Sequence, residues 1–262
     1  MAATPGLDDD ELQAWLRLVL ADGVGRADAR RLLAAFGPPT ALFAARPPAW
    51  AAVVGESVAA GLRSPPGDFD RWLAATRAWL AAGPGRAIWA LGDPAYPPAL
   101  LQTPDPPLLL CAQGDPAWLA RPAIAIVGSR NASAQGLDNA RAFARALGEA
   151  GYVIVSGLAA GIDGAAHEGA LAGPGGTLAV VGTGPDRVYP ARHRALAHRI
   201  VERGLILSEF LPGTPPLAAN FPQRNRLIAA LSQGTLVVEA ALQSGSLITA
   251  RLAAEAGREV FA

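Results

Sequence analysis

The 262-residue sequence contains no lysine, so all 22 of its basic side chains other than histidine are arginine. With 29 Gly, 23 Pro and abundant alanine, this composition indicates the coding bias of a GC-rich genome, and the number of arginines by itself says little about function. A single cysteine, Cys111, excludes an intramolecular disulfide and a cysteine-based metal site. The three histidines show no metal-ligand spacing with carboxylates. We therefore expect neither a metal nor a cofactor.

Long apolar segments are also missing. No uninterrupted apolar run approaches the roughly 18 residues of a membrane span. The N-terminus carries four consecutive acids from Asp8 to Glu11 instead of a basic and then apolar signal peptide. A hydrophobic content of 51% with 17% charged residues favours a folded globular protein. We expect a cytoplasmic protein without membrane contact.

The charge is balanced overall but unevenly distributed along the chain. The formal net charge is zero, which argues against a wholly basic nucleic-acid coat. Residues 1–120 carry a net −3 and residues 121–262 a net +3. From Arg187 to Arg226 there are seven arginines and only two acids. An anion-binding function is therefore expected in the second half.

Residues 1–82 predict a small all-α domain. Leu12, Trp15, Leu16 and Val19 recur at the spacing of a core-facing helix, and further apolar helical segments follow. The glycines at 23–25 resemble the turn of a helix-hairpin-helix motif, which binds a DNA phosphate. A plain turn is the alternative, and we favour it because this half is acidic, although three nearby cations keep the motif open. These cations are Arg26, Arg30 and Arg31.

The second half predicts an α/β domain with a parallel sheet. Residues 83–122 are rich in Pro and Gly and indicate a linker with lead-in strands at 88–91 and 108–112. From residue 123 onward apolar strands alternate with helices, over 123–262. Strands are expected at 123–128, 152–156, 177–182, 205–208, 235–239 and 259–261. Helices are expected at 134–150, 162–171, 192–203, 222–231 and 247–256.

Small and polar residues follow each strand, where open α/β sheets bind ligands. The first strand ends in IVGSRNAS, which lacks the G-x-G-x-x-G fingerprint of dinucleotide binding. A phosphate-sized anion held by Ser129, Arg130 and the start of the next helix fits better than the alternative of a tight turn with a solvated arginine. The other strand-end candidates are Ser156, Gly157, Gly161, Tyr189, Pro190, Arg192, His193, Ser244, Gly245 and Ser246.

Asp163 and His167 lie four residues apart at the start of a predicted helix. Such a pair can perform acid–base chemistry. Because no G-x-S-x-G nucleophile accompanies them, we favour a structural role in which they order the glycine loop.

The stretch NFPQRNR, residues 220–226, predicts a helix start with Pro222 at the first helical position. Arg224 and Arg226 would then sit at the positive end of the helix dipole, at a cost of about 0.3–1 kcal/mol each. Arg130 and Arg192 are expected at the same edge of the sheet. Four such cations together favour a ligand with several phosphates.

In order along residues 88–262, the motifs IVGSR, SGLAAGIDGAAH, GTGPDRVYP, NFPQRNRLIAALS and SGSLITARLAAEAGREVFA resemble the DNA-processing protein A (DprA/Smf) family. The resemblance implies an extended Rossmann-like domain that binds single-stranded DNA, forms a homodimer and loads the recombinase RecA during natural transformation. It also implies a SAM-like N-terminal domain. The DNA pocket that it implies falls on Gly128, Ser129, Arg130, Gly157, Gly161, Tyr189, Pro190, Arg192, Asn220, Arg224, Asn225 and Arg226.

Two departures from the family pattern stand out. Arg192 follows the Tyr-Pro pair where a lysine is common, and the family domain normally continues past EVFA, so the sequence predicts a truncated domain. If the family function holds, Arg130→Ala or Arg224→Ala is expected to weaken strand binding with thermal unfolding nearly unchanged.

One enzymatic alternative exists on a related fold. A nucleoside-monophosphate phosphoribohydrolase of the lysine-decarboxylase-like group would use Glu239 at a strand end. That group carries P-G-G-x-G-T-x-x-E, whereas this chain has SQGTLVVEA without the double glycine. We therefore favour a non-catalytic DNA-binding protein.

Overall fold

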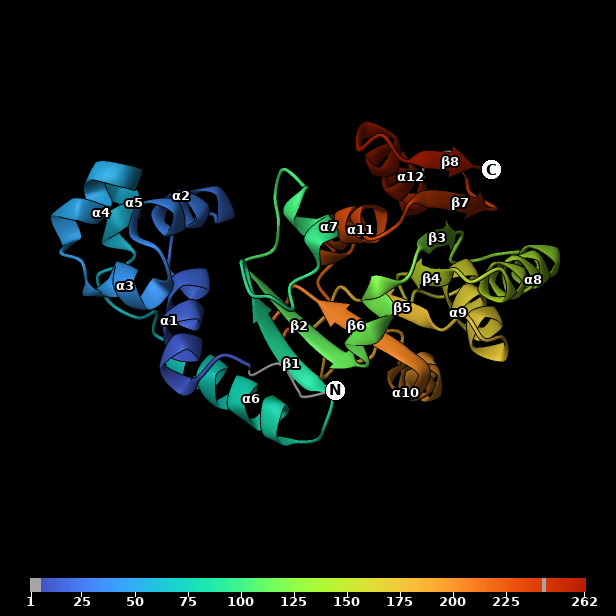
Figure 1. The fold of residues 1–262 in the computed structure, drawn as a ribbon, viewed down its shortest axis with the longest axis horizontal. Helices are drawn as coiled ribbons and strands as arrows, with labels where there is room; N and C mark the ends of the chain where they lie inside the picture. Colours follow the sequence, from blue (N-terminus) through green and yellow to red (C-terminus); the bar gives the residue numbers. More distant parts are fainter. Residues whose placement is uncertain (1–5, 242–243) are drawn as a thin grey trace. The chain divides into compact units, whose positions relative to one another are not determined.

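The computed structural model describes residues 6–241 and 244–262. The chain divides into two compact units (Figure 1). The first comprises residues 1–83, 87–96 and 104–110, and the second comprises residues 84–86, 97–103 and 111–262. The proline- and glycine-rich segment 83–122 is therefore shared between the two units.

The first unit is built around helices, drawn in blue to teal in Figure 1. They are α1 (Asp9–Leu20), α2 (Arg26–Phe36), α3 (Pro39–Ala44), α4 (Pro47–Val54), α5 (Glu56–Ala60) and α6 (Phe69–Ala81). Helix α1 begins with a capping box, because Asp8 accepts from the Glu11 N–H while the Glu11 carboxylate accepts from the Asp8 N–H. Its face with Leu12, Trp15 and Leu16 is buried, as the spacing predicts.

The turn between α1 and α2 gives the helix-hairpin-helix alternative no support. Gly23 adopts a φ of +72°, which a plain turn also requires. Arg26 and Arg30 form ion pairs with Asp105, and Arg31 pairs with Asp28. Each cation that kept this alternative open is therefore already engaged with a carboxylate, two of them with the same one.

An eight-stranded sheet follows in the order β1-β2-β6-β5-β4-β3-β7-β8. Its strands are β1 (Arg86–Ala90), β2 (Leu109–Gly114), β3 (Ala123–Gly128), β4 (Val153–Ser156), β5 (Thr177–Val180), β6 (Gly204–Ser208), β7 (Gly234–Val238) and β8 (Glu259–Phe261). Strands β3 to β8 are all parallel to one another, whereas β2 runs antiparallel to β6. The expected α/β class with an extended Rossmann-like parallel sheet is confirmed.

Helices connect the parallel strands close to the expected positions. They are α8 (Ala134–Glu149), α9 (Ile162–Ala172), α10 (Arg194–Arg203), α11 (Asn220–Ala230) and α12 (Gly245–Glu255). Short helices that were not expected are α7 (Pro98–Leu101), which precedes β2, and the 3₁₀ helices η1 (Pro116–Ala120) and η2 (Ala191–His193). Two expected starts are wrong. Helix α11 begins two residues before Pro222, and a separate 3₁₀ turn precedes α10.

The strand order reverses next to β3. Strands β4, β5 and β6 extend the sheet in one direction, and the chain then crosses back to place β7 on the other side of β3. Because such crossovers are right-handed, α8, α9 and α10 lie on one face and α11 and α12 on the other. The connections after β3 and β7 thus diverge, which opens a crevice at their carboxyl ends.

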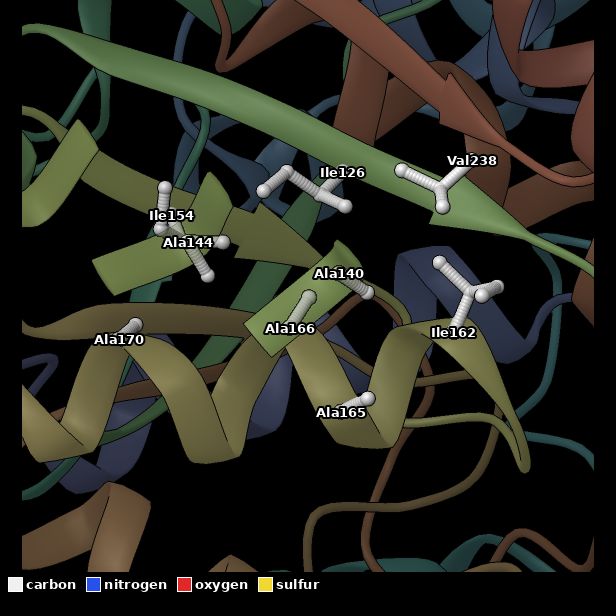
Figure 2. Packing of buried hydrophobic residues seen from close by; sticks show 9 residues of the cluster. All are labelled: Ile126, Ala140, Ala144, Ile154, Ile162, Ala165, Ala166, Ala170 and Val238. Atoms are coloured by element: carbon white, nitrogen blue, oxygen red, sulfur yellow. The ribbon is translucent and has the colours of Figure 1, made fainter. Parts of the chain in front are cut away.

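Small side chains fill the core between the sheet and its helices. Figure 2 shows Ile126, Ile154 and Val238 of the strands facing alanines of α8 and α9, with Ile162 at the start of α9. The alanines are Ala140, Ala144, Ala165, Ala166 and Ala170. Such residues let α8 and α9 approach each other and the sheet closely, so the loop that begins α9 is held firmly against the end of β3.

None of the helices in the described ranges 6–241 and 244–262 is long and apolar enough to cross a membrane. Within the same ranges, His, Cys, Asp and Glu side chains form no group that could hold a metal ion.

Candidate nucleic-acid interface

A pocket of about 460 Å³ lies at the strand-order reversal, where the loops after β3 and β7 meet the starts of α9, α11 and α12. Eight of the sequence-predicted binding residues line it: Gly128, Ser129, Arg130, Arg224, Asn225, Ser244, Gly245 and Ser246. Asp163 lines it as well. The chain thus gathers residues that are up to about a hundred positions apart in sequence into one crevice.

Two smaller hollows adjoin this pocket at Arg130. One of about 340 Å³ is lined by Gly161, Arg192 and His193, and one of about 90 Å³ by Gly157, Tyr189 and Pro190. Arg130 lines all three. Its side chain is exposed, and within the described part of the chain it forms no ion pair. Arg130 is therefore a solvent-facing cation at the junction of three hollows.

An aromatic pair lies beside this cation. The Arg130 guanidinium lies 5.6 Å from the centre of the Phe221 ring, and the Tyr189 ring lies 5.5 Å from Phe221 at a tilt of 42°. Tyr189 is 50% exposed. A flat ring next to a guanidinium offers both stacking for a base and charge for a phosphate.

Arg224 does not join Arg130 as a free cation, contrary to the sequence expectation. It is 3% exposed, and its Nη1 donates 2.6 Å to the Gly157 carbonyl and also to the Val180 carbonyl. Burial lowers the pKa of Arg224 to about 10, against the opposing charge of Asp163. Arg224 is still protonated at neutral pH. Its guanidinium holds the loop after β4 through the hydrogen bond to the Gly157 carbonyl.

Arg226 is also turned away from the role expected for it. Its guanidinium forms an ion pair with Glu209, and the two side chains are only 16% and 4% exposed. Contacts within the protein thus offset the free-energy cost expected for two cations at the start of α11. Arg224 donates hydrogen bonds to the carbonyls of Gly157 and Val180, and Arg226 forms an ion pair with Glu209.

Two polar candidates support the backbone rather than face the pocket. Ser156 is fully buried and donates to the Ile126 carbonyl at 2.6 Å. Asn220 is 8% exposed and donates to the Gly182 carbonyl at 3.1 Å. Ser156 ties β4 to β3, and Asn220 ties the start of α11 to the segment after β5. The sequence pattern does not distinguish these roles from ligand contact.

The start of α8 differs from the expected anion site, because a carboxylate of the chain already occupies it. Ser133 caps α8, and both its N–H and its hydroxyl donate to the Glu239 carboxylate, at 3.0 and 2.6 Å. A phosphate at this position would face that negative charge. Glu239, the residue on which the enzymatic alternative depends, is thus engaged in capping α8.

Asp163 orders the glycine loop between β4 and α9. Its Oδ2 accepts from the Gly157 N–H at 3.1 Å and the Ala159 N–H at 3.3 Å. The carboxyl is buried, which raises its pKa, while Arg224 and these two donors oppose the rise.

His167 supports the same loop from deeper in the core. Its Nε2 accepts from the Leu158 N–H at 3.3 Å, and its Nδ1 lies 2.7 Å from the Thr177 hydroxyl. Because that hydroxyl donates to the Ile154 carbonyl at 2.6 Å, Nδ1 must be the donor to it. His167 is therefore neutral with its proton on Nδ1.

This buried histidine predicts a loss of stability in acid. Burial lowers the pKa of His167 from its ordinary value of 6.5 to about 3. A depressed pKa contributes stability that is present above pH 6.5 and lost as the pH falls toward 3, with a slope of up to about 1.4 kcal/mol per pH unit. Urea unfolding at several pH values is expected to show a shallower decline for His167→Asn than for the unmodified protein. His198→Asn, at an exposed histidine, is the control. If stability falls as steeply with pH in His167→Asn as in the unmodified protein, His167 does not cause the loss of stability in acid.

The glycine loop packs directly on the backbone of the Arg130 loop. Gly161 has a φ of +76°, and the Ile162 N–H donates to the Ser129 carbonyl at 3.1 Å. A Cβ at residue 161 would clash with the Ser129 carbonyl and lie 2.8 Å from the Arg130 carbonyl. The loop that carries Arg130 therefore requires glycine at residue 161 for both conformation and space.

Gly161→Ala is expected to lower the free energy of unfolding by at least about 2 kcal/mol, from backbone strain and from the clash. Gly257→Ala is a matched control, because Gly257 has a φ of +70° with open space around its Cα. Urea denaturation compares the two variants. Equal costs for both would show that the packing against the Arg130 loop is unimportant.

His193 connects the Tyr-Pro loop to the glycine loop. Its Nδ1 lies 3.0 Å from the Leu158 carbonyl, to which it donates, and a Cβ on Gly164 would lie 2.7 Å from its ring. Leu158 has a φ of +57° and is 1% exposed. The backbone of this residue is thus held between two histidines, with His167 at its N–H. This places the neighbouring Arg192 at the rim of the hollow that it shares with Arg130.

Phe221, Asn131 and Thr249 are not among the site residues expected from the sequence. All three line the pocket. The position of Phe221 beside the arginines that start α11 is the one sequence signal that could have indicated it. Its contact with Arg130 depends on the fold.

The comparisons with known proteins concern the same region. The family model for DNA recombination-mediator protein A matches residues 87–262. Protein Smf of Escherichia coli strain K12 is 51% identical over 168 residues, which cover 64% of this chain and 45% of that protein. DNA processing protein DprA of Streptococcus pneumoniae is 48% identical over 170 residues, 65% of this chain and 60% of that protein. The chain spans about half the length of these curated relatives.

Solved structures agree with this match. DNA processing protein A from Streptococcus pneumoniae superposes with a TM-score of 0.79 at 33% identity, over 98% of this chain and 86% of that one. DNA processing protein A from Helicobacter pylori, whose structure concerns its single-stranded DNA binding mode, has a TM-score of 0.61 at 35% identity, over 66% and 79% of the two chains. Sequence, fold and strand-end motifs coincide, and the chain belongs to the DNA recombination-mediator protein A family.

Proposed function

We propose that this chain binds single-stranded DNA across the pocket and the two hollows that meet at Arg130. The observation that carries the proposal is the state of Arg130, which is exposed, unpaired among the described residues and shared by all three hollows. A cation in this position interacts with phosphate, and the hollows on either side give a strand room to continue.

A strand fits the site better than a mononucleotide. Arg130 and Arg192 both line the 340 Å³ hollow, while the Tyr189–Phe221 pair adjoins the 90 Å³ hollow. Cationic groups on one side and stacking surface on the other match a polymer whose phosphates and bases alternate along its length. Binding of this kind is tolerant of sequence.

We propose a non-catalytic role. The phosphoribohydrolase alternative needs a free carboxylate at the end of β7, and both Glu239 oxygens instead accept from Ser133. The family name supports a role as a recombination mediator. We further propose that the chain loads RecA onto incoming strands in natural transformation and works as a homodimer. The test of this part is whether the protein speeds the assembly of RecA on oligo-dT and whether its mass in solution is that of two chains.

The binding proposal is tested by competition. Fluorescein-labelled oligo-dT is expected to be displaced by unlabelled single strands at concentrations at least tenfold below those needed for a mononucleotide such as dTMP. Equal displacement by dTMP, or release of free base from a nucleoside monophosphate, would favour the enzymatic alternative instead.

A further inference from the structure

Helix α10 presents basic side chains that the pocket does not use. Arg194, His198 and Arg199 are exposed, and we call these three residues the α10 surface. On its other side the same helix buries Leu196 and Ile200 in the core. The two arginines are therefore fixed on the outer side of α10 by the packing of the inner side.

The α10 surface differs from the exposed faces of α6, α8 and α12 in having no acid partner. On those three helices, exposed arginines pair with carboxylates three or four residues away, as in Arg71–Asp68, Arg145–Glu149 and Arg251–Glu255. Among the described residues Arg194 and Arg199 form no ion pair, although Glu202 follows Arg199 on the same helix. Because composition bias supplies arginine everywhere in this chain, the missing acids are more informative than the arginines.

The same surface continues from the candidate site. Arg130 and Arg192 line one hollow, and Arg192 precedes Arg194 by two residues through η2. At a rise of 1.5 Å per residue, the five residue steps from Arg194 to Arg199 extend the basic surface by roughly 7.5 Å along α10. Arginines without acid partners at the start of α10 lie at the positive end of the helix dipole, which raises the free energy of the unbound protein. An anionic ligand bound along this surface would remove that cost.

We propose that the α10 surface binds the phosphate backbone of the same single strand after it leaves the hollow between Arg130 and Arg192. This inference rests on the proposed function and extends it to a second, purely electrostatic segment. Because the α10 surface has no aromatic side chain, it binds phosphates without reading bases. A strand long enough to reach from the pocket to α10 interacts with this surface as well, and a strand that fills only the pocket does not.

The test compares oligo-dT of about 6 and about 24 nucleotides by fluorescence anisotropy across a salt series. The first length lies near the lower end of the roughly 4–16 nucleotides of known single-strand sites, and the second exceeds the upper end. The double variant Arg194→Gln/Arg199→Gln is expected to bind the long strand about fivefold more weakly at ~0.1 M salt. Its salt slope is expected to fall by about 1.4, at ~0.7 for each phosphate that is no longer neutralised. Binding of the short strand is expected to stay unchanged.

The matched control is Arg145→Gln/Arg251→Gln, which changes the net charge equally but on helices whose arginines have acid partners. Thermal unfolding of both double variants verifies that they fold. If Arg194→Gln/Arg199→Gln binds the long strand normally, or weakens both lengths equally, the α10 inference is wrong while the proposed function stands. If the unmodified protein binds neither length, the proposed function and the α10 inference both fail.

Discussion

Arg130→Gln is expected to weaken binding of oligo-dT about 10- to 100-fold while leaving the free energy of unfolding within about 0.5 kcal/mol of the unmodified value. A hydrogen bond to a charged group contributes about 1.5–3 kcal/mol, and each 1.4 kcal/mol is tenfold in affinity. Arg130 is exposed and unpaired among residues 6–241 and 244–262, so its removal leaves no protein group without a partner. Anisotropy titrations and urea unfolding measure the two effects.

Arg121→Gln is the control for Arg130. Arg121 is exposed as well, but it precedes β3 and stacks on Trp118 at the amino end of the strand, away from the pocket. Its substitution is expected to change affinity by less than about twofold. If the two variants lose affinity equally, net charge rather than a phosphate bound at Arg130 explains the binding.

Arg224→Met is expected to destabilise the protein by about 3–5 kcal/mol, the usual cost of removing one partner from a buried charge network. The carbonyls of Gly157 and Val180 would lose their hydrogen-bond donor. Asp163 would lose the positive charge that counteracts the effect of burial on its pKa. Urea unfolding measures the loss, with Arg145→Met as the control for replacing an arginine on an exposed helix surface.

This outcome replaces the expectation drawn from the sequence, in which Arg224→Ala leaves unfolding nearly unchanged. A variant with normal stability and weakened strand binding would show that Arg224 contacts the strand directly and would contradict the buried arrangement. Arg224→Met that is unstable but binds normally once folded at low temperature would show a role limited to loop support.

The fold could be predicted closely because its pattern is local. Strands of three to six residues alternate with helices from β3 onward, and the boundaries of β3 and β8 match the sequence expectation. The start of α11 was misplaced because Pro222 is tolerated anywhere in a first helical turn and does not mark its first residue. The reversal of strand order next to β3 depends on packing of whole elements, which periodicity does not encode.

The location of the site could be predicted from the sequence, but the orientations of its side chains could not. The strand-end rule brought Ser129, Arg130 and Ser244 to one edge, where the structure has them. It did not indicate that Arg224 points inward to carbonyls or that Arg226 meets Glu209. Both interactions join segments more than fifteen residues apart, so one sequence without its fold gives no means of telling a phosphate-binding arginine from a structural one.

The salt dependence of oligo-dT binding by the unmodified chain tests the central claim most directly. If phosphates are held by Arg130, Arg192 and the α10 surface, the logarithm of the association constant falls linearly with the logarithm of salt concentration, at about 0.7 per bound phosphate, and the slope steepens with strand length. Arg130→Gln is expected to lower that slope. Binding that is absent, or that is insensitive to salt at every length, would contradict the account.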